Sequence, residues 1–301
     1  MSDARAALDR RGLGQALTRL AHAQVPVLPE LPAGAAAAPA RRIGFTGAPG
    51  AGKSTLVGRM ALQRTRDRRV GVLAIDPSSP LTGGAILGDR IRMDEVDEAG
   101  ELYVRSVASK SATDGLADQA PEMLDAMEAF GFDELVLETV GVGQAERAVR
   151  QMVDTLVLVL PPDAGDHVQA MKAGIAELAD IVVINKADQP GAQRMAADVK
   201  RVVAFARRAK QAWTPPVLLT SINDAGSIAA LSQAVDAHAD WLAGSDALPA
   251  LRLARARYRL VRFIERLARS VVDEQDLPFF SQPLPQQVRC AADLIARQAG
   301  P

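Results

Sequence analysis

Short apolar runs recur along the middle of the chain, and segments with helical periodicity separate most of them. Helical patterns are found over residues 56–62, 115–130, 167–179, 191–210 and 227–242. Continuous apolar strands that alternate with helices are typical of a mostly parallel sheet with helices on both faces. The pattern therefore predicts a three-layer α/β protein whose strands lie at residues 42–46, 70–75, 102–107, 135–137, 155–160, 181–184 and 217–219.

The two ends of the chain have a different character. Residues 4–23 carry a weak amphipathic helical pattern, and the prolines and alanines of 24–40 predict a linker. Residues 249–272 predict an Arg-rich helix with a broad apolar band, which packs either on its own domain or on a second subunit. A short helix is expected near 286–298. We therefore expect an N-terminal helical segment and linker, an α/β domain and a C-terminal helical extension, at residues 1–40, 41–245 and 246–301.

Composition narrows the function classes. The net charge of −1 over 301 residues argues against a dedicated nucleic-acid binder. The single Cys290 excludes an intramolecular disulfide and a cysteine-based metal cluster. The start lacks the apolar core of a signal peptide, and no apolar run is long enough to span a bilayer. A cytoplasmic protein without a membrane partner is expected.

The strongest chemical signal lies between the first strand and the first helix of the α/β region. It fits the phosphate-loop pattern of Gly, four residues and Gly-Lys-Ser/Thr, so the fold is predicted to be that of a P-loop NTPase. Its glycines permit turns that bring successive amides onto phosphate oxygens. Lys53 is expected to contact the β- and γ-phosphates, and the Ser54 hydroxyl to bind Mg²⁺. The loop consists of Gly47, Ala48, Pro49, Gly50, Ala51, Gly52, Lys53, Ser54 and Thr55.

A second polar motif, Asn-Lys-Ala-Asp at 185–188, directly follows the sixth predicted strand. The Asp188 carboxylate can accept hydrogen bonds from both N1 and N2 of guanine, a donor pair that adenine lacks. Asn185 and Lys186 are expected to orient the loop and cover the base. Ser221, after the seventh strand, either offers backbone contacts to the base oxygen or belongs to an ordinary turn. The expected ligands are GTP and GDP.

Acidic and polar residues at other strand ends complete the predicted site. Glu138, after the fourth strand, can act on Mg²⁺ directly or through water, and the amide of Gly141 can approach the γ-phosphate. Gln144 either orients water or is simply exposed. Asp76 and Asp89, in the long loop after the second predicted strand, can complete the metal environment with oxygen ligands. Asp89 can equally be a helix cap.

The segment 163–172 follows the fifth strand and ends on a lysine. Lys172 can neutralise charge that develops during phosphoryl transfer, or it is a solvated helix residue.

Together these motifs resemble the MeaB/ArgK-like family of P-loop GTPases, with the most specific match over 76–84. Those proteins are chaperones of methylmalonyl-CoA mutase and related adenosylcobalamin-dependent acyl-CoA mutases. The resemblance is strong over 41–245 and weaker at both ends. It implies a GTPase that gates cofactor loading and protection of a B12-dependent mutase. It further implies Mg²⁺ near Asp76, Asp89 and Glu138, a Lys172 that becomes catalytic when the mutase binds, and a homodimer formed by the C-terminal helices.

Three other classes share nucleotide motifs with this chain. A targeting GTPase for membrane proteins would need a Met-rich, groove-forming domain, which this sequence lacks. A metal-insertion GTPase usually carries a His-rich tract or paired cysteines, and the chain has three histidines and one cysteine. An amino-acid transport-associated ATPase or kinase would bind ATP, against which Asp188 argues.

Overall fold

The structure is a computed structural model of the chain. It describes residues 7–23, 25–29, 39–77, 100–109, 117–139, 145–163, 179–206 and 213–298.

Seven strands form one sheet in the order β3-β2-β4-β1-β5-β6-β7, and every neighbouring pair is parallel. All seven strands predicted from the apolar runs are confirmed, and the sheet that the structure describes is parallel throughout rather than mostly so. The strands are β1 (Arg41–Gly47), β2 (Val70–Pro77), β3 (Leu102–Ser109), β4 (Glu134–Glu138), β5 (Thr155–Leu160), β6 (Ile181–Ile184) and β7 (Val217–Leu219).

Helices cover both faces of this sheet, as the three-layer prediction requires. Leu135 and Leu137 of β4 face a core with α1, α4 and α5, whereas Val136 faces the core of α2 and α9. Helix α8 packs on β5, β6 and β7. The helices of these layers are α1 (Arg10–His22), α2 (Lys53–Arg64), α4 (Ala120–Ala129), α5 (Ala145–Arg150), α8 (Ala192–Ala206) and α9 (Ala225–Ala243).

Some helices begin at residues other than those predicted from the periodicity of the sequence. Helix α1 begins at Arg10 because the Asp9 side chain accepts from the Gly12 amide and caps it. Helix α4 begins at Ala120 rather than at 115, with a proline in its first turn. The six-residue α5 was not expected from the pattern. The predicted helix 167–179 lies outside the described residues apart from its last position.

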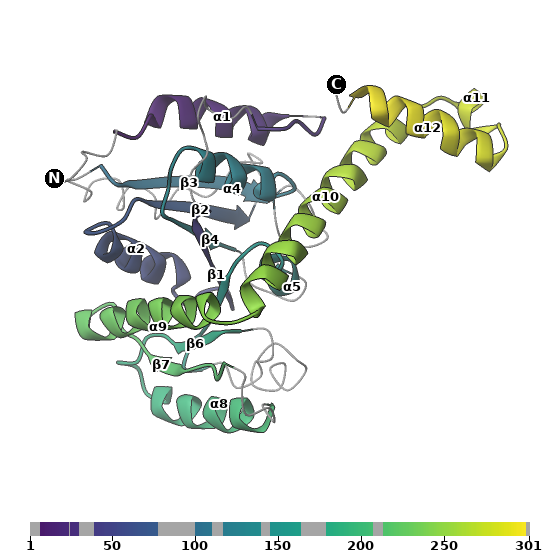
Figure 1. Ribbon diagram of the computed structural model, residues 1–301. Coiled ribbons are helices and arrows are strands. Elements are labelled where there is room, and N and C mark those ends of the chain that lie inside the picture. The colour runs from purple at the N-terminus through teal and green to yellow at the C-terminus, as the bar shows by residue number, and fades with distance from the viewer. Residues whose placement is uncertain are drawn as a thin grey trace.

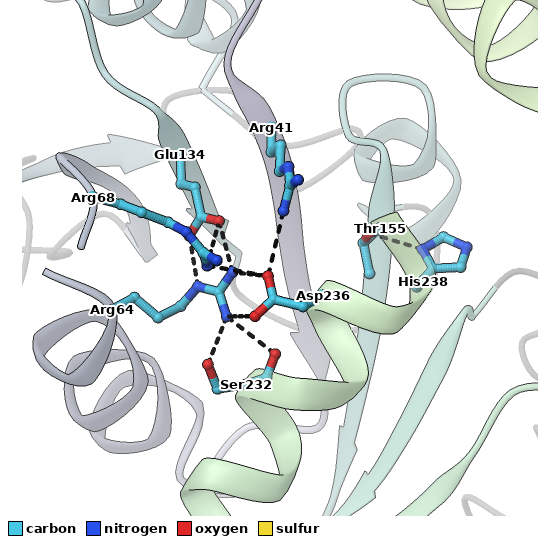
Figure 2. Close-up of polar contacts among 8 residues, drawn as sticks. All are labelled: Arg41, Arg64, Arg68, Glu134, Thr155, Ser232, Asp236 and His238. Carbon is cyan, nitrogen blue, oxygen red and sulfur yellow. Dashed lines mark hydrogen bonds and ion pairs between the residues drawn. The ribbon is translucent and has the colours of Figure 1, made fainter. Parts of the chain in front are cut away.

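A buried ion-pair network ties the phosphate-loop helix to the rest of the fold (Figure 2). The Arg64 and Glu134 side chains are each only 1% exposed and form a two-pronged pair, with N–O distances of 2.5 and 2.6 Å. Arg64 also bonds Asp236 at 2.8 Å. The network joins β1, α2, the turn after it, β4 and α9 through Arg41, Arg64, Arg68, Glu134, Ser232 and Asp236.

The two sides of the long helix α10 (Ala247–Asp273) have different surroundings. Four of its arginines face the protein's own body, where Arg255 pairs with Asp154, Arg259 with Asp125, Arg262 with Asp118 and Arg266 with Glu122. The sequence left open whether this helix packs on its own domain or on another subunit, and the arginine side packs on its own domain.

The apolar side of α10 is largely exposed. The helix runs away from the sheet toward α11 (Leu277–Phe280) and α12 (Leu284–Gln298) (Figure 1). Only Leu267 and Val271 of α10 are buried. The exposed large apolar residues of these three helices are Leu253, Leu260, Val261, Ile264, Val272, Leu277, Phe280, Leu284 and Val288.

Across the described ranges, no helix combines the length and apolar character needed to cross a membrane.

Candidate functional site

All strands run in the same direction, so their carboxyl ends share one edge of the sheet. Strands β2, β3 and β4 lie on one side of the central β1, and the later strands β5, β6 and β7 lie on its other side. In open parallel sheets, ligands bind outside the carboxyl ends where the strand order reverses. The ends of β1 and β4 and the segments after β6 and β7 carry the predicted site residues to this edge.

The phosphate loop adopts a backbone that its glycines make possible. Gly47, Gly50 and Gly52 have φ values of +138°, +74° and +83°, a region that residues with a Cβ avoid. A Cβ on Gly47 would lie 1.9 Å from the Val159 carbonyl oxygen, so no side chain fits there. The loop therefore passes closely over β5 and delivers the chain into α2 at Lys53.

Lys53 is the first residue of α2 and is buried. Its Nζ donates to the carbonyl oxygens of Gly47 at 2.9 Å and Ala48 at 3.0 Å. The ammonium group is thus held across the loop, beside the amides that would receive a phosphate. Ionised phosphate oxygens accept stronger hydrogen bonds than neutral carbonyls, so this position suits a phosphate-binding lysine.

Two residues of the predicted metal set are in direct contact. The Ser54 hydroxyl donates to Glu138 Oε1 at 2.6 Å, which joins the start of α2 to the end of β4. Asp76 lies near the end of the adjacent strand β2, where Ala74 is in register with Glu138. The Ser54 hydroxyl therefore lies at the start of α2, and the two carboxylates lie on residues near the ends of the neighbouring strands β2 and β4.

Asn185 connects the phosphate loop to the segment expected to hold the base. It is 2% exposed, and its Nδ2 donates to the Ala51 carbonyl oxygen at 2.8 Å. Its Oδ1 accepts from the Thr220 hydroxyl at 2.9 Å. Both polar atoms of this side chain therefore serve the protein itself, so Asn185 orients the two loops.

Lys186 is the one non-glycine residue in the described part of the chain with positive φ, at 57°. Its Cε lies 3.9 Å from the point where a Cβ on Gly52 would be, so the lysine stem passes over the start of α2. The following amide, of Ala187, donates to the Thr220 carbonyl and holds this turn in place. Such strained positions persist where surrounding contacts fix them, often at ligand sites.

The Asp188 side chain is exposed, but a hydrogen bond fixes its orientation. Its Oδ1 accepts from the Ser221 hydroxyl at 2.6 Å, and this bond lowers the pKa of Asp188 below its usual value. The carboxylate is therefore ionised and fixed in direction near neutral pH. The Ser221 amide, in contrast, donates to Ser227 Oγ at 3.1 Å. The structure thus gives the Ser221 side chain a positioning contact, whereas the sequence pointed to its backbone.

Four predicted site residues, Asp89, Gly141, Gln144 and Lys172, lie outside the described residues. In contrast, sequence reasoning missed Thr220 and Ser227, which hold Asn185 and Ser221. Thr220 is fully buried directly after β7, and its place immediately beyond an apolar strand was the signal available.

Comparisons with known proteins identify the relatives of this chain. A protein from Caulobacter vibrioides is 45% identical over 185 residues, which are 60% of this chain and 57% of that protein. The mouse protein named methylmalonic aciduria type A homolog, mitochondrial, is 40% identical over 193 residues, 62% of this chain and 46% of its own length. The matches thus span about half the length of these two relatives.

A solved structure, described as LAO/AO transport system kinase, matches 97% of this chain and all of its own, with a TM-score of 0.59 and 23% identity. At that identity the likeness shows a shared fold. The family model described as methylmalonyl Co-A mutase-associated GTPase MeaB matches residues 19–276. The chain therefore belongs to the MeaB family of P-loop proteins.

Proposed function

We propose that this protein binds GTP with Mg²⁺, hydrolyses the γ-phosphate anhydride, and serves as a chaperone of an adenosylcobalamin-dependent acyl-CoA mutase. One observation carries the nucleotide half of the proposal. Asn185 hydrogen-bonds the phosphate loop at Ala51 while the same segment presents an ionised Asp188 held by Ser221. Phosphate recognition and guanine recognition are thus parts of one connected structure.

The expected chemistry is attack of water on the γ-phosphate. Negative charge spreads over the phosphoryl oxygens in the transition state, and preorganised donors stabilise it. The loop amides after Gly47, the Lys53 ammonium and the N-terminus of α2 are such donors. Lys53 needs only to exchange two carbonyl acceptors for phosphate oxygens, because it already lies in the loop.

Mg²⁺ fits the donors present. In the described part of the chain no group of three or more His, Cys, Asp and Glu side chains is arranged to hold a metal by itself. Mg²⁺ typically takes one or two protein oxygens and completes its shell with phosphate and water. Ser54 and Glu138, joined at 2.6 Å, would hold it, with Asp76 beside them. When bound, the ion would neutralise phosphate charge.

Family membership supports the proposed partner. The family description names methylmalonyl Co-A mutase, the mouse relative is named after methylmalonic aciduria, and the resemblance of the motifs points to a B12-dependent mutase. We infer that the mutase regulates hydrolysis and that the GTPase in turn gates cofactor loading.

Phosphate release from GTP and from ATP, with Mg²⁺ and with EDTA, tests the nucleotide half. We expect hydrolysis of GTP alone, dependent on Mg²⁺ and faster when the cognate mutase is added. Equal hydrolysis of ATP would refute guanine specificity. Hydrolysis unaffected by methylmalonyl-CoA and isobutyryl-CoA type mutases would refute the chaperone role while leaving the GTPase in place.

Lys172→Ala is expected to leave basal GTP hydrolysis nearly unchanged and to remove most of the stimulation by the mutase. A cation that reaches the phosphates only in the complex with the mutase contributes nothing to the unstimulated reaction. Lys200→Ala, an exposed lysine on α8, is the matched control and should keep full stimulation. If Lys172→Ala is stimulated as strongly as the parent protein, Lys172 is only a solvated residue.

We also propose that the exposed apolar side of α10 forms a homodimer. Apolar residues on α10, α11 and α12 are exposed together, and such a surface on a single chain typically marks an interface. The arginine side of α10 is occupied by α4, so the apolar side is the one available to a second copy.

Ile264→Asp is expected to yield a monomer, because it places a charge in the centre of that surface without touching the core. Ile264 is 47% exposed in the single chain, so the fold should persist. Ala204→Asp, on the exposed side of α8, controls for the added charge. Light scattering distinguishes the two, and an Ile264→Asp protein that stays dimeric would place the interface elsewhere.

A further inference from the structure

A hollow of about 620 Å³ lies between α4, α10 and the segment at Leu28 and Pro29. None of its lining residues belongs to the phosphate loop or to the base-binding segments. Its volume is in the range of small-molecule sites, which are typically mostly apolar with a few placed polar groups. The lining has that character: Leu28, Pro29, Glu122, Asp125, Glu128, Ala129, Ala256, Arg259, Leu260 and Phe263.

The polar side of the hollow is a row of carboxylates on one face of α4. Asp125 is bonded by Arg42 and by Arg259, and Glu128 is bonded by Arg42. These two carboxylates therefore have guanidinium partners already.

Glu122 is different, because only half of its carboxylate has a partner. Its Oε1 pairs with Arg266, but Oε2 is buried and has no hydrogen-bond partner among the described residues. The residue as a whole is 3% exposed. Burial raises the pKa of Glu122 above its usual value in spite of the charge of Arg266. A buried acceptor without a donor is costly, and a bound donor would remove that cost.

We propose that this hollow binds a small organic cation, whose ammonium or amidinium group donates to Glu122 Oε2 while its apolar body lies against Leu260 and Phe263. A positively charged donor suits this position because Arg266 pairs with Oε1 of Glu122 and leaves Oε2 without a donor, and a charged donor makes the stronger hydrogen bond to a carboxylate oxygen. Asp125 and Glu128 on the same wall are already paired with Arg42 and Arg259, so they do not compete for the ligand. The apolar residues opposite provide contact area that a bare metal ion or ammonia would not use.

Calorimetric titration of the full-length protein with benzamidine tests the site. Benzamidine combines a phenyl ring with an amidinium group, and benzamide has the same shape without the charge. We expect saturable binding of one benzamidine per chain and at least about ten-fold weaker binding of benzamide, equivalent to about 1.4 kcal/mol. No saturable binding of benzamidine, or equal binding of the two probes, would overturn the proposal.

Variants of the lining residues test whether benzamidine binds in the hollow. Glu122→Gln should weaken benzamidine by at least about ten-fold, whereas Asp118→Asn, which alters the neighbouring carboxylate paired with Arg262, should bind normally. Ala256→Trp fills the hollow from an exposed position without changing Glu122, so it should also abolish binding even if Glu122→Gln folds poorly. Unchanged affinity in Ala256→Trp would overturn the assignment. GTP hydrolysis without the mutase should be unchanged in Ala256→Trp, which separates this site from the proposed GTPase site.

Discussion

Glu134→Ala is expected to lower the free energy of unfolding by about 3–5 kcal/mol, because it leaves the buried Arg64 guanidinium without its main partner. Both side chains are 1% exposed, so water cannot replace the lost carboxylate. Burial by itself lowers the pKa of Arg64, but its bonds to Glu134 and Asp236 outweigh burial and raise that pKa. Arg64 therefore stays charged, and in the variant this buried charge keeps only the partly exposed Asp236 as an ionic partner.

Urea denaturation at neutral pH measures this loss. Asp198→Ala is the matched control, since it breaks an ion pair with Arg201 whose side chains are 36% and 78% exposed. Exposed pairs contribute about 0–1 kcal/mol, so the control should change stability little. A loss below about 1 kcal/mol in Glu134→Ala would show that the network in Figure 2 does not stabilise the fold as its geometry indicates.

The strands of this fold could be predicted from sequence because the sheet is buried on both faces. Every residue of β4, β5 and β6 is buried, and each strand contains an uninterrupted apolar run, which in β4 is residues 135–137 between its two glutamates. The phosphate loop was equally readable, because its chemistry is local: nine consecutive residues form the turn, the lysine and the helix start.

Contacts between distant segments could not be predicted from the pattern of apolar and polar residues. The bond from Asn185 to Ala51 joins residues 134 positions apart, and no periodicity encodes it. The α10 helix illustrates the same limit. Its apolar and arginine stripes were both visible, but only the position of α4 shows that the arginines meet Asp125 and Glu122. A stripe in a sequence predicts that a surface is covered without identifying what covers it.

Asp188→Asn is expected to weaken GTP binding by roughly 100-fold and to remove the preference for guanine. The carboxylate offers two acceptors to the N1 and N2 hydrogens of the base, and Ser221 holds it at 2.6 Å in a fixed direction. Each hydrogen bond to a charged acceptor is worth about 1.5–3 kcal/mol. The amide of asparagine keeps one acceptor, loses the charge and turns an NH₂ group toward a donor of the base.

Xanthosine triphosphate separates a lost hydrogen-bond pattern from a damaged loop. Xanthine carries a carbonyl where guanine has its N2 amine, so it offers one donor and one acceptor, which match the amide of Asn. Asp188→Asn should therefore bind xanthosine triphosphate more tightly than GTP, whereas the parent protein should show the reverse order. Calorimetry with both nucleotides and both proteins measures these affinities. If the variant binds GTP as tightly as the parent does, Asp188 does not contact the base. If it binds neither nucleotide, the substitution has disrupted the segment that Asn185 and Ser221 hold. In that case Ser221→Ala is the variant to measure, because it removes the hydrogen bond to Asp188 without removing the charge. It should show a smaller loss of GTP affinity and keep the preference for guanine.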